Sequence, residues 1–183
     1  MSKVRADAHR NRERLLAAAT DAFTAADGTA VSLEAIARDA GVGIGTLYRH
    51  FATREALVEA VYQTELAEVA ASAGQLLARH PPLVALRRWM DRYAAFVAAK
   101  RGMAESLRAM FAAGTVKPSD TRDSVIGAVE TLLSAGSSEG TVRSDVRAED
   151  VVTSLIGIFL ASGSTEQAHR MLDLLLDGLV TTR

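Results

Sequence analysis

The chain has 183 residues, of which 49% are hydrophobic and 23% are charged, and its formal net charge is −1 at pH 7. This composition supports a substantial core and excludes extensive disorder. Cysteine is absent, which excludes disulfides and thiolate metal sites. No apolar run approaches the roughly 18 residues of a membrane span, and no signal-peptide pattern opens the chain, so we expect a cytoplasmic protein without a membrane segment.

The first 14 residues are basic, although the chain as a whole is not. They hold five Lys and Arg residues against two Asp and Glu residues, an excess of three positive charges. This arm either lies along DNA phosphates or is a disordered, solubilising tail. A first helix is expected over about residues 11–26, ending at Asp27 and Gly28.

Two short helical patterns meet at a glycine within residues 32–51, SLEAIARDAGVGIGTLYRHF. The first follows Ser32, a candidate N-cap, and Gly41 predicts its end because glycine readily adopts the left-handed conformation. The second spans about residues 43–51, with Leu47 and Phe51 expected to face inward. Such a pair is either a helix-turn-helix or an ordinary helical hairpin.

The second of these helices carries a polar face that suits DNA. Thr46, Arg49 and His50 are neighbours at helical spacing, and Tyr48 flanks them. Hydroxyl, guanidinium and imidazole groups bind phosphates and base edges. Gly45 allows the backbone to approach DNA closely.

The motif AIARDAGVGIGTLYRHF, followed by TREALVEAV, resembles the N-terminal signature of the TetR family of bacterial repressors over about residues 11–62. The resemblance implies a three-helix DNA-binding domain, a long fourth helix, and a C-terminal helical bundle that binds a ligand and dimerises. It also implies DNA contacts by Ser32, Thr46, Tyr48, Arg49, His50 and Arg54.

Two positions depart from the family pattern, which often has serine at Gly43 and lysine or arginine at Ile44. Both changes weaken the grip on phosphate. Ile44 either extends the buried stripe or contacts a thymine methyl, and we expect partial burial. Arg54 follows Thr53, a candidate cap, and either holds the duplex edge or is a solvated surface residue. The candidate DNA-binding residues are Ser32, Gly43, Ile44, Gly45, Thr46, Tyr48, Arg49, His50 and Arg54.

Helical periodicity continues along the chain and strand alternation is almost absent, so we expect an all-α fold of about nine helices. The later helices are expected at about residues 53–79, 83–100, 103–113, 121–135, 148–162 and 165–180. We expect a DNA-binding domain over residues 1–52, with the start of the fourth helix to about residue 62, and a ligand-binding and dimerisation domain over residues 53–183.

Aromatic and thioether side chains gather on the helices expected at residues 83–100 and 103–113. This clustering fits either an adaptable apolar pocket or a fully packed core. The resemblance implies an effector cavity in this region. The candidate ligand-binding residues are Trp89, Tyr93, Phe96, Met103, Leu107, Met110 and Phe111.

The last two expected helices are apolar around more than one face. One face packs inward, and the surplus indicates a two-fold dimer interface, which the resemblance also implies; a monomer core is the alternative. The candidate interface residues are Val152, Leu155, Ile156, Phe159, Met171, Leu172, Leu175 and Leu179.

Catalytic patterns are few: the sequence has no thiol, no glycine-rich phosphate loop and no serine elbow. Glu166 and His169 have metal-ligand spacing, but a helical di-metal site needs two such elements. We therefore expect no enzyme, no metal and no cofactor. The expected function is a homodimeric repressor that binds a palindromic operator and is released by a small apolar or amphipathic effector. The alternatives are a small helical enzyme or carrier, and an activator with the same DNA-binding surface.

Overall fold

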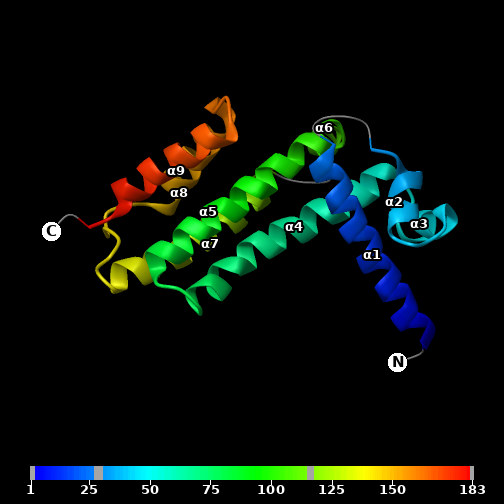
Figure 1. Cartoon of the computed structure of the whole chain (residues 1–183), viewed down its shortest axis with the longest axis horizontal. Coiled ribbons are helices and arrows are strands. Elements are labelled where there is room, and N and C mark those ends of the chain that lie inside the picture. The colour runs from blue at the N-terminus through cyan, green and yellow to red at the C-terminus, as the bar shows by residue number, and fades with distance from the viewer. Residues whose placement is uncertain (1–2, 27–30, 115–117, 182–183) are drawn as a thin grey trace. The chain divides into compact units, whose positions relative to one another are not determined.

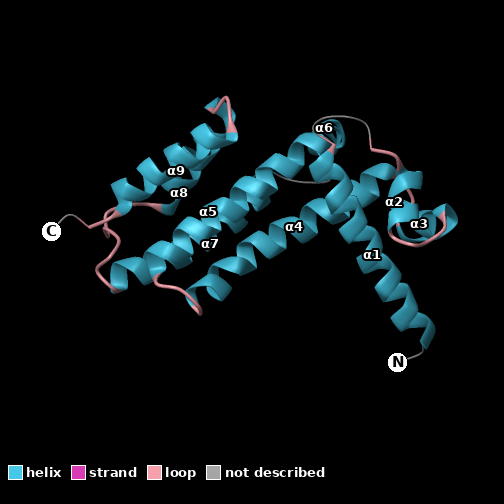
Figure 2. Cartoon of the chain, in the orientation of Figure 1, coloured by secondary structure: helices cyan, strands magenta, loops and turns pink. Residues whose placement is uncertain are grey.

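The computed structural model describes residues 3–26, 31–114 and 118–181, which form nine α-helices and one short 3-10 helix (Figure 1). The helices are α1 (Lys3–Ala25), α2 (Leu33–Asp39), α3 (Ile44–His50), α4 (Arg54–Leu77), α5 (Pro82–Ala99), η1 (Lys100–Met103), α6 (Ala104–Ala113), α7 (Pro118–Ser138), α8 (Ala148–Ala161) and α9 (Thr165–Leu179). Within these segments β pairing is limited to an isolated bridge between Val142 and Val180, and Figure 2 shows helices joined by loops. The all-α prediction is confirmed.

Helix α1 begins at Lys3 rather than near residue 11. Residues 3–10 contain neither glycine nor proline, and charged pairs one turn apart support the helix. Arg10 pairs with Asp7, and His9 Nδ1 lies 3.3 Å from Glu13 Oε1. The basic arm is therefore a continuation of the first helix, and the interpretation as a disordered tail is wrong for the residues described.

The chain divides into two compact units, which are described separately. Unit 1 comprises residues 1–65 and 98–117, and unit 2 comprises residues 66–97 and 118–183. Helix α4 contributes its first turns to unit 1 and its remainder to unit 2, while η1 and α6 belong to unit 1. The boundary between these compact units therefore differs from the predicted boundary near residue 52 between a DNA-binding and a ligand-binding domain. That functional boundary stays a prediction.

The core of unit 1 joins the first helix to the two short helices and the start of α4. Leu15 and Phe23 of α1, Ile36 of α2, Leu47 of α3 and Leu57 of α4 are all buried. Burial of each such side chain contributes about 1.5–3 kcal/mol. This apolar contact fixes the orientation of α3 and leaves its other face exposed.

The core of unit 2 is built around Trp89 of α5, whose indole Nε1 donates a 3.0 Å hydrogen bond to the carbonyl oxygen of Val69. Leu132, Leu155 and Leu172 bring α7, α8 and α9 into this core. Among the residues described here, no helix combines the length and apolar character needed to cross a membrane.

Candidate nucleic-acid interface

Helices α2 and α3 form a helix-turn-helix. Ser32 caps α2, since its Oγ accepts a 3.3 Å hydrogen bond from the Ala35 backbone N–H. Gly41 has a φ of +67° and donates a 2.9 Å hydrogen bond to the carbonyl oxygen of Arg38. A left-handed glycine thus ends α2, as the sequence predicted, and α3 begins at Ile44.

The inner side of α3 is held by apolar packing. Leu47 and Phe51 are both buried, which confirms the inward direction predicted for them. The guanidinium carbon of Arg12 on α1 lies 5.3 Å from the centroid of the Phe51 ring, a cation–π contact. Helix α1 is therefore attached to the C-terminal end of α3, and α3 is presented on a fixed base.

The outer side of α3 brings most of the candidate DNA-binding residues together. Tyr48 is 47% exposed, and Arg49 is exposed with its Nε donating a 3.2 Å hydrogen bond to the Gly45 carbonyl oxygen. Gly43 and Gly45 are also exposed, whereas Thr46 and His50 are half-buried. Ile44 is exposed, at 37%, so it does not extend the buried stripe of α3 and the expected partial burial is wrong.

Arg54 differs from the other candidates because its guanidinium has partners inside unit 1. Its Nη1 donates a 2.6 Å hydrogen bond to the carbonyl oxygen of Val31, and its guanidinium carbon lies 5.7 Å from the Phe23 ring centroid. Thr53 caps α4, as predicted, by accepting a 3.2 Å hydrogen bond from the Ala56 N–H. Arg54 therefore ties the start of α4 to α1 and to the segment before α2.

A carboxylate stands beside the candidate phosphate contact at Ser32. The Ser32 hydroxyl donates a 2.9 Å hydrogen bond to Glu34 Oε2. Hydrogen bonds from its own backbone N–H and from Ser32 hold the pKa of Glu34 below its ordinary value. The start of α2 therefore carries a negative charge next to the hydroxyl, a feature that the sequence analysis did not single out.

The candidate ligand-binding residues are largely packed. Trp89, Tyr93 and Phe96 are buried in unit 2, where the Trp89 and Tyr93 rings stack with centroids 5.4 Å apart. The Phe159 and Tyr93 ring centroids lie 5.8 Å apart in an edge-to-face arrangement. In unit 1 the buried members are Met103, Leu107 and Met110, while the side chain of Phe111 lies outside the described residues.

Two hollows that the structure describes lie away from these residues. One, of about 510 Å³, is lined by Asp7, Arg10, Asn11, Glu13 and Arg14 of α1. The other, of about 300 Å³, is lined by Leu133, Ser134, Ser137, Ser138, Arg143, Ser144 and Val146. A pocket formed by the candidate ligand-binding residues stays a prediction.

Lys100 in η1 is a half-buried cation that the sequence analysis did not identify. Its Nζ lies 5.2 Å from the centroid of the buried Tyr62 ring in unit 1. Burial lowers the pKa of Lys100 to about 8. Tyr62 is 38 positions away in the sequence, so no local pattern indicated this contact.

Burial within one chain divides the candidate dimer residues into two groups. Ile156, Phe159, Met171 and Leu175 are half-buried. Leu160 on α8 was missed, although it is 83% exposed and shares a helical face with Ile156. Leu174 on α9, part of the apolar surplus of the last helix, is 72% exposed. Four further candidates are buried in the core of one chain: Val152, Leu155, Leu172 and Leu179. They have almost no surface to offer a second chain, so the prediction that they lie in the dimer interface needs correcting.

The Glu-x-x-His element of α9 has other structural roles. Hydrogen bonds from its own backbone N–H and from the cap residue Ser164 lower the pKa of Glu166. His169 Nδ1 lies 3.8 Å from Asp91 Oδ1 of α5. Throughout the described segments, no three His, Asp or Glu side chains gather in an arrangement that could hold a metal ion.

Comparison with known proteins assigns the chain to a family. Residues 15–61 match the family of bacterial regulatory proteins named for TetR, and residues 81–181 match the C-terminal domain of SbtR-like transcriptional regulators. A TetR transcriptional regulator from Streptomyces coelicolor is 46% identical, with a TM-score of 0.84 over 94% of this chain and 99% of that chain. A TetR regulator from Mycobacterium vanbaalenii is 34% identical, with a TM-score of 0.76 over 97% and 99%.

A more distant solved structure shares the fold. It is a gamma-butyrolactone receptor, 24% identical, with a TM-score of 0.59 over 96% of this chain and 91% of that chain. The family assignment rests on the two family models and on the more similar structures, which agree along nearly the whole chain. The chain therefore belongs to the TetR family of bacterial transcriptional regulators, which are helix-turn-helix DNA-binding proteins rather than enzymes.

Proposed function

We propose that this protein is a transcriptional repressor that binds a roughly palindromic operator as a homodimer and leaves it when a small effector binds. The exposed face of α3 is the observation that carries this proposal. Tyr48 and Arg49 supply hydrogen-bonding groups there, and Gly45 permits close approach. As a regulator of bacterial DNA, the protein acts in the cytoplasm.

In this proposal α3 enters the major groove and reads base edges. The Arg49 guanidinium suits the paired acceptors of guanine, and Ile44 contacts a thymine methyl group. Ser32, at the start of α2, contacts the backbone. Two copies of α3, about 34–36 Å apart, occupy successive faces of the duplex.

The two copies meet through α8 and α9. Leu160 and Leu174 are the most exposed large apolar residues that the structure describes, and both lie on these helices. Ile156, Phe159, Met171 and Leu175 extend the same apolar surface. A second copy of the chain covers this surface in a two-fold arrangement.

The effector is a small apolar or amphipathic molecule, and the aromatic residues Trp89, Tyr93 and Phe96 of α5 in unit 2 are its candidate contacts. A gamma-butyrolactone receptor shares this fold, so the fold accommodates a small ligand in that protein. Release from DNA requires that the effector prefer a conformation unable to bind the operator. A preference of about 1–3 kcal/mol lowers DNA affinity by about 5 to 150-fold.

The test is binding of the purified protein to DNA upstream of its own gene and neighbouring genes, against random duplex at fixed salt. We expect nanomolar affinity for one such site, at least about a thousandfold above random DNA. Tyr48→Ala combined with Arg49→Ala should weaken this binding by about 100-fold or more while the dimer persists. Arg92→Ala, on an exposed position of α5, is the matched control.

Equal, weak binding to all duplexes would reject the proposal. A reporter assay then distinguishes the sign of regulation. Deletion of the gene should raise transcription from the bound promoter, and a fall in transcription would identify an activator instead.

A further inference from the structure

We propose that Arg14 of α1 binds a backbone phosphate of the operator beside the start of the recognition helix, within a polar face of α1 that also contains Arg10 and Asn11. The inference rests on the proposed function and adds a DNA contact that lies outside the helix-turn-helix itself. Two observations support it: the hollow lined by Asp7, Arg10, Asn11, Glu13 and Arg14, which we call the α1 hollow, and the position of the Arg14 guanidinium.

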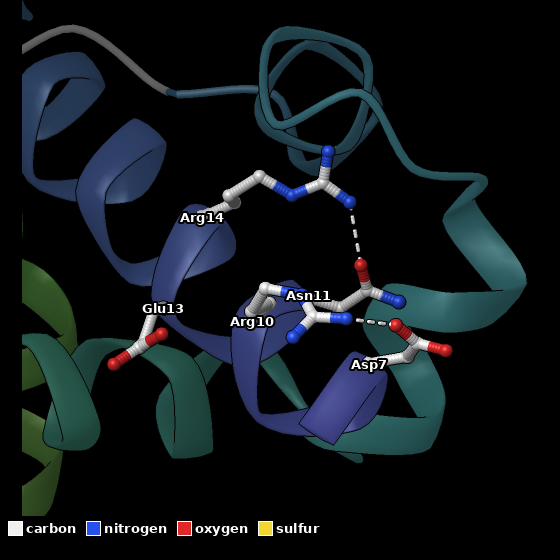
Figure 3. Close-up of a pocket in the computed structure, with 5 residues that line it drawn as sticks. All are labelled: Asp7, Arg10, Asn11, Glu13 and Arg14. Carbon is white, nitrogen blue, oxygen red and sulfur yellow. Dashed lines mark hydrogen bonds and ion pairs between the residues drawn. The ribbon is translucent and has the colours of Figure 1, made fainter. Parts of the chain in front are cut away.

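The α1 hollow, of about 510 Å³, lies on the exposed early turns of this helix. Figure 3 shows Arg14, Arg10, Asn11 and Asp7 on one side of α1, with Glu13 directed away from them. Arg14 and Arg10 are spaced by one helical turn, so both cations serve the same surface.

The Arg14 guanidinium lies against the turn between α2 and α3. Its Nη1 is 3.5 Å from the position that a Cβ atom would occupy on Gly41. This separation is an ordinary van der Waals contact, so the guanidinium lies directly against the turn. The turn directly precedes α3, so the position of Arg14 is fixed with respect to the start of the recognition helix.

Arg14 keeps hydrogen-bonding capacity for a ligand. Its Nη2 donates to Asn11 Oδ1, the hydrogen bond that the structure describes for this side chain. A guanidinium has five N–H donors and suits phosphate oxygens. Arg10 is more nearly neutralised, because Asp7 pairs with it. Glu13 points away from Arg14 and lies 3.3 Å from His9 (Figure 3). Arg14 is therefore the principal cation of this face.

DNA geometry makes a backbone phosphate the matching ligand. The start of a recognition helix points into the major groove, so the turn before it lies near the phosphates that border the groove. The cap and first residues of α3 provide no cation there, since Gly43, Ile44 and Gly45 are uncharged. Arg14 supplies that charge from the neighbouring helix.

The experiment measures operator affinity of the full-length dimer across a salt series for the native protein, Arg14→Ala and Arg14→Gln. A phosphate contact contributes about 0.9 to the slope of log K against log salt, so loss in both protomers should lower the slope by about 2. We expect an affinity loss of about tenfold at moderate salt. The preference for operator over random duplex should remain, because phosphate contacts carry no direct sequence information.

Arg14→Lys retains the charge and should retain most of the salt slope. Arg92→Ala on α5 is the control for a general loss of positive charge and should leave the salt slope unchanged. An unchanged affinity in Arg14→Ala and Arg14→Gln would overturn the inference. A weaker affinity with an unchanged slope would also overturn it, since Arg14 would then only position the turn at Gly41. Failure of the native protein to prefer any operator would instead reject the proposed function, independently of the variants.

Discussion

The side chain of Arg54 donates a 2.6 Å hydrogen bond to the backbone carbonyl oxygen of Val31. This bond connects the first residue of α4 to the chain just before α2, so the long helix and the helix-turn-helix share a fixed attachment point. Under the proposed function, this attachment links any displacement of the start of α4 to the helix-turn-helix.

Arg54→Ala should destabilise the fold. The half-buried hydrogen bond to Val31 involves a charged donor, and its loss should lower the free energy of unfolding by about 1.5–3 kcal/mol. Urea unfolding followed by circular dichroism measures this change. Arg49→Ala, at an exposed position of α3, should change stability by less than about 0.5 kcal/mol. Native stability in Arg54→Ala, with a reduced salt slope for DNA binding, would identify Arg54 as a phosphate contact instead.

Glu34→Gln should strengthen binding to DNA of any sequence. The carboxylate at the start of α2 accepts a hydrogen bond from Ser32 and repels phosphate from that hydroxyl. Its removal should raise affinity about two to fivefold at low salt, with a smaller gain at high salt. Fluorescence anisotropy with a labelled duplex measures the effect. Glu55→Gln, in the first turn of α4, is the matched control, and an equal gain there would contradict a specific role for Glu34.

Lys100→Met should remove a pH-dependent component of stability. The pKa of Lys100 is lowered by burial from 10.5 to about 8, so between these values the unfolded chain binds more protons than the folded chain. Stability of the native protein therefore rises with pH across this window, and the cost is fully present below about pH 8. The variant should be about 2 kcal/mol more stable at pH 7 and lose this advantage near pH 10.5.

Denaturant unfolding of Lys100→Met and the native protein at several pH values checks this prediction. Parallel stability curves for the two proteins would show that the ammonium group carries no burial cost. The Tyr62 ring beside Nζ provides a further comparison, because Tyr62→Phe keeps the aromatic face and should preserve the pH dependence.

Leu160→Glu and Leu174→Glu should each weaken the dimer. Both side chains are exposed in a single chain, and burial of a leucine against a partner contributes about 1.5–3 kcal/mol. We expect a rise in the dimer dissociation constant of at least tenfold in sedimentation experiments, about 1.4 kcal/mol. Val84→Glu places the same charge on an exposed apolar position of α5 and should leave the dimer intact. Unchanged association of both leucine variants would exclude this surface.

Local chemistry explains why the helix-turn-helix could be predicted from the sequence. Ser32 caps α2, Gly41 has the left-handed conformation expected of it, and Leu47 and Phe51 are buried. Each of these features depends on residues within a few positions of one another, so their spacing carries the information. The family motif lies in the same short segment.

Features that depend on distant residues were predicted less well. Helix α1 starts earlier than its apolar periodicity indicated, because charged pairs rather than apolar contacts support its first turns. The sequence left Arg54 either at the duplex edge or as a solvated residue. It did not indicate the contacts with Val31 and Phe23, because these lie on segments that only folding brings near Arg54.

The sequence by itself determined an all-α chain, the helix-turn-helix and the polar residues of α3, because helix periodicity, capping and glycine turns act over a few residues. The tertiary structure decided which apolar residues of α8 and α9 are internal, which aromatic ring lies beside Lys100, and which cation lies beside Gly41. Those properties depend on burial and on contacts between helices far apart in the chain, and an apolar pattern is the same whether a neighbouring helix or a second protein covers it.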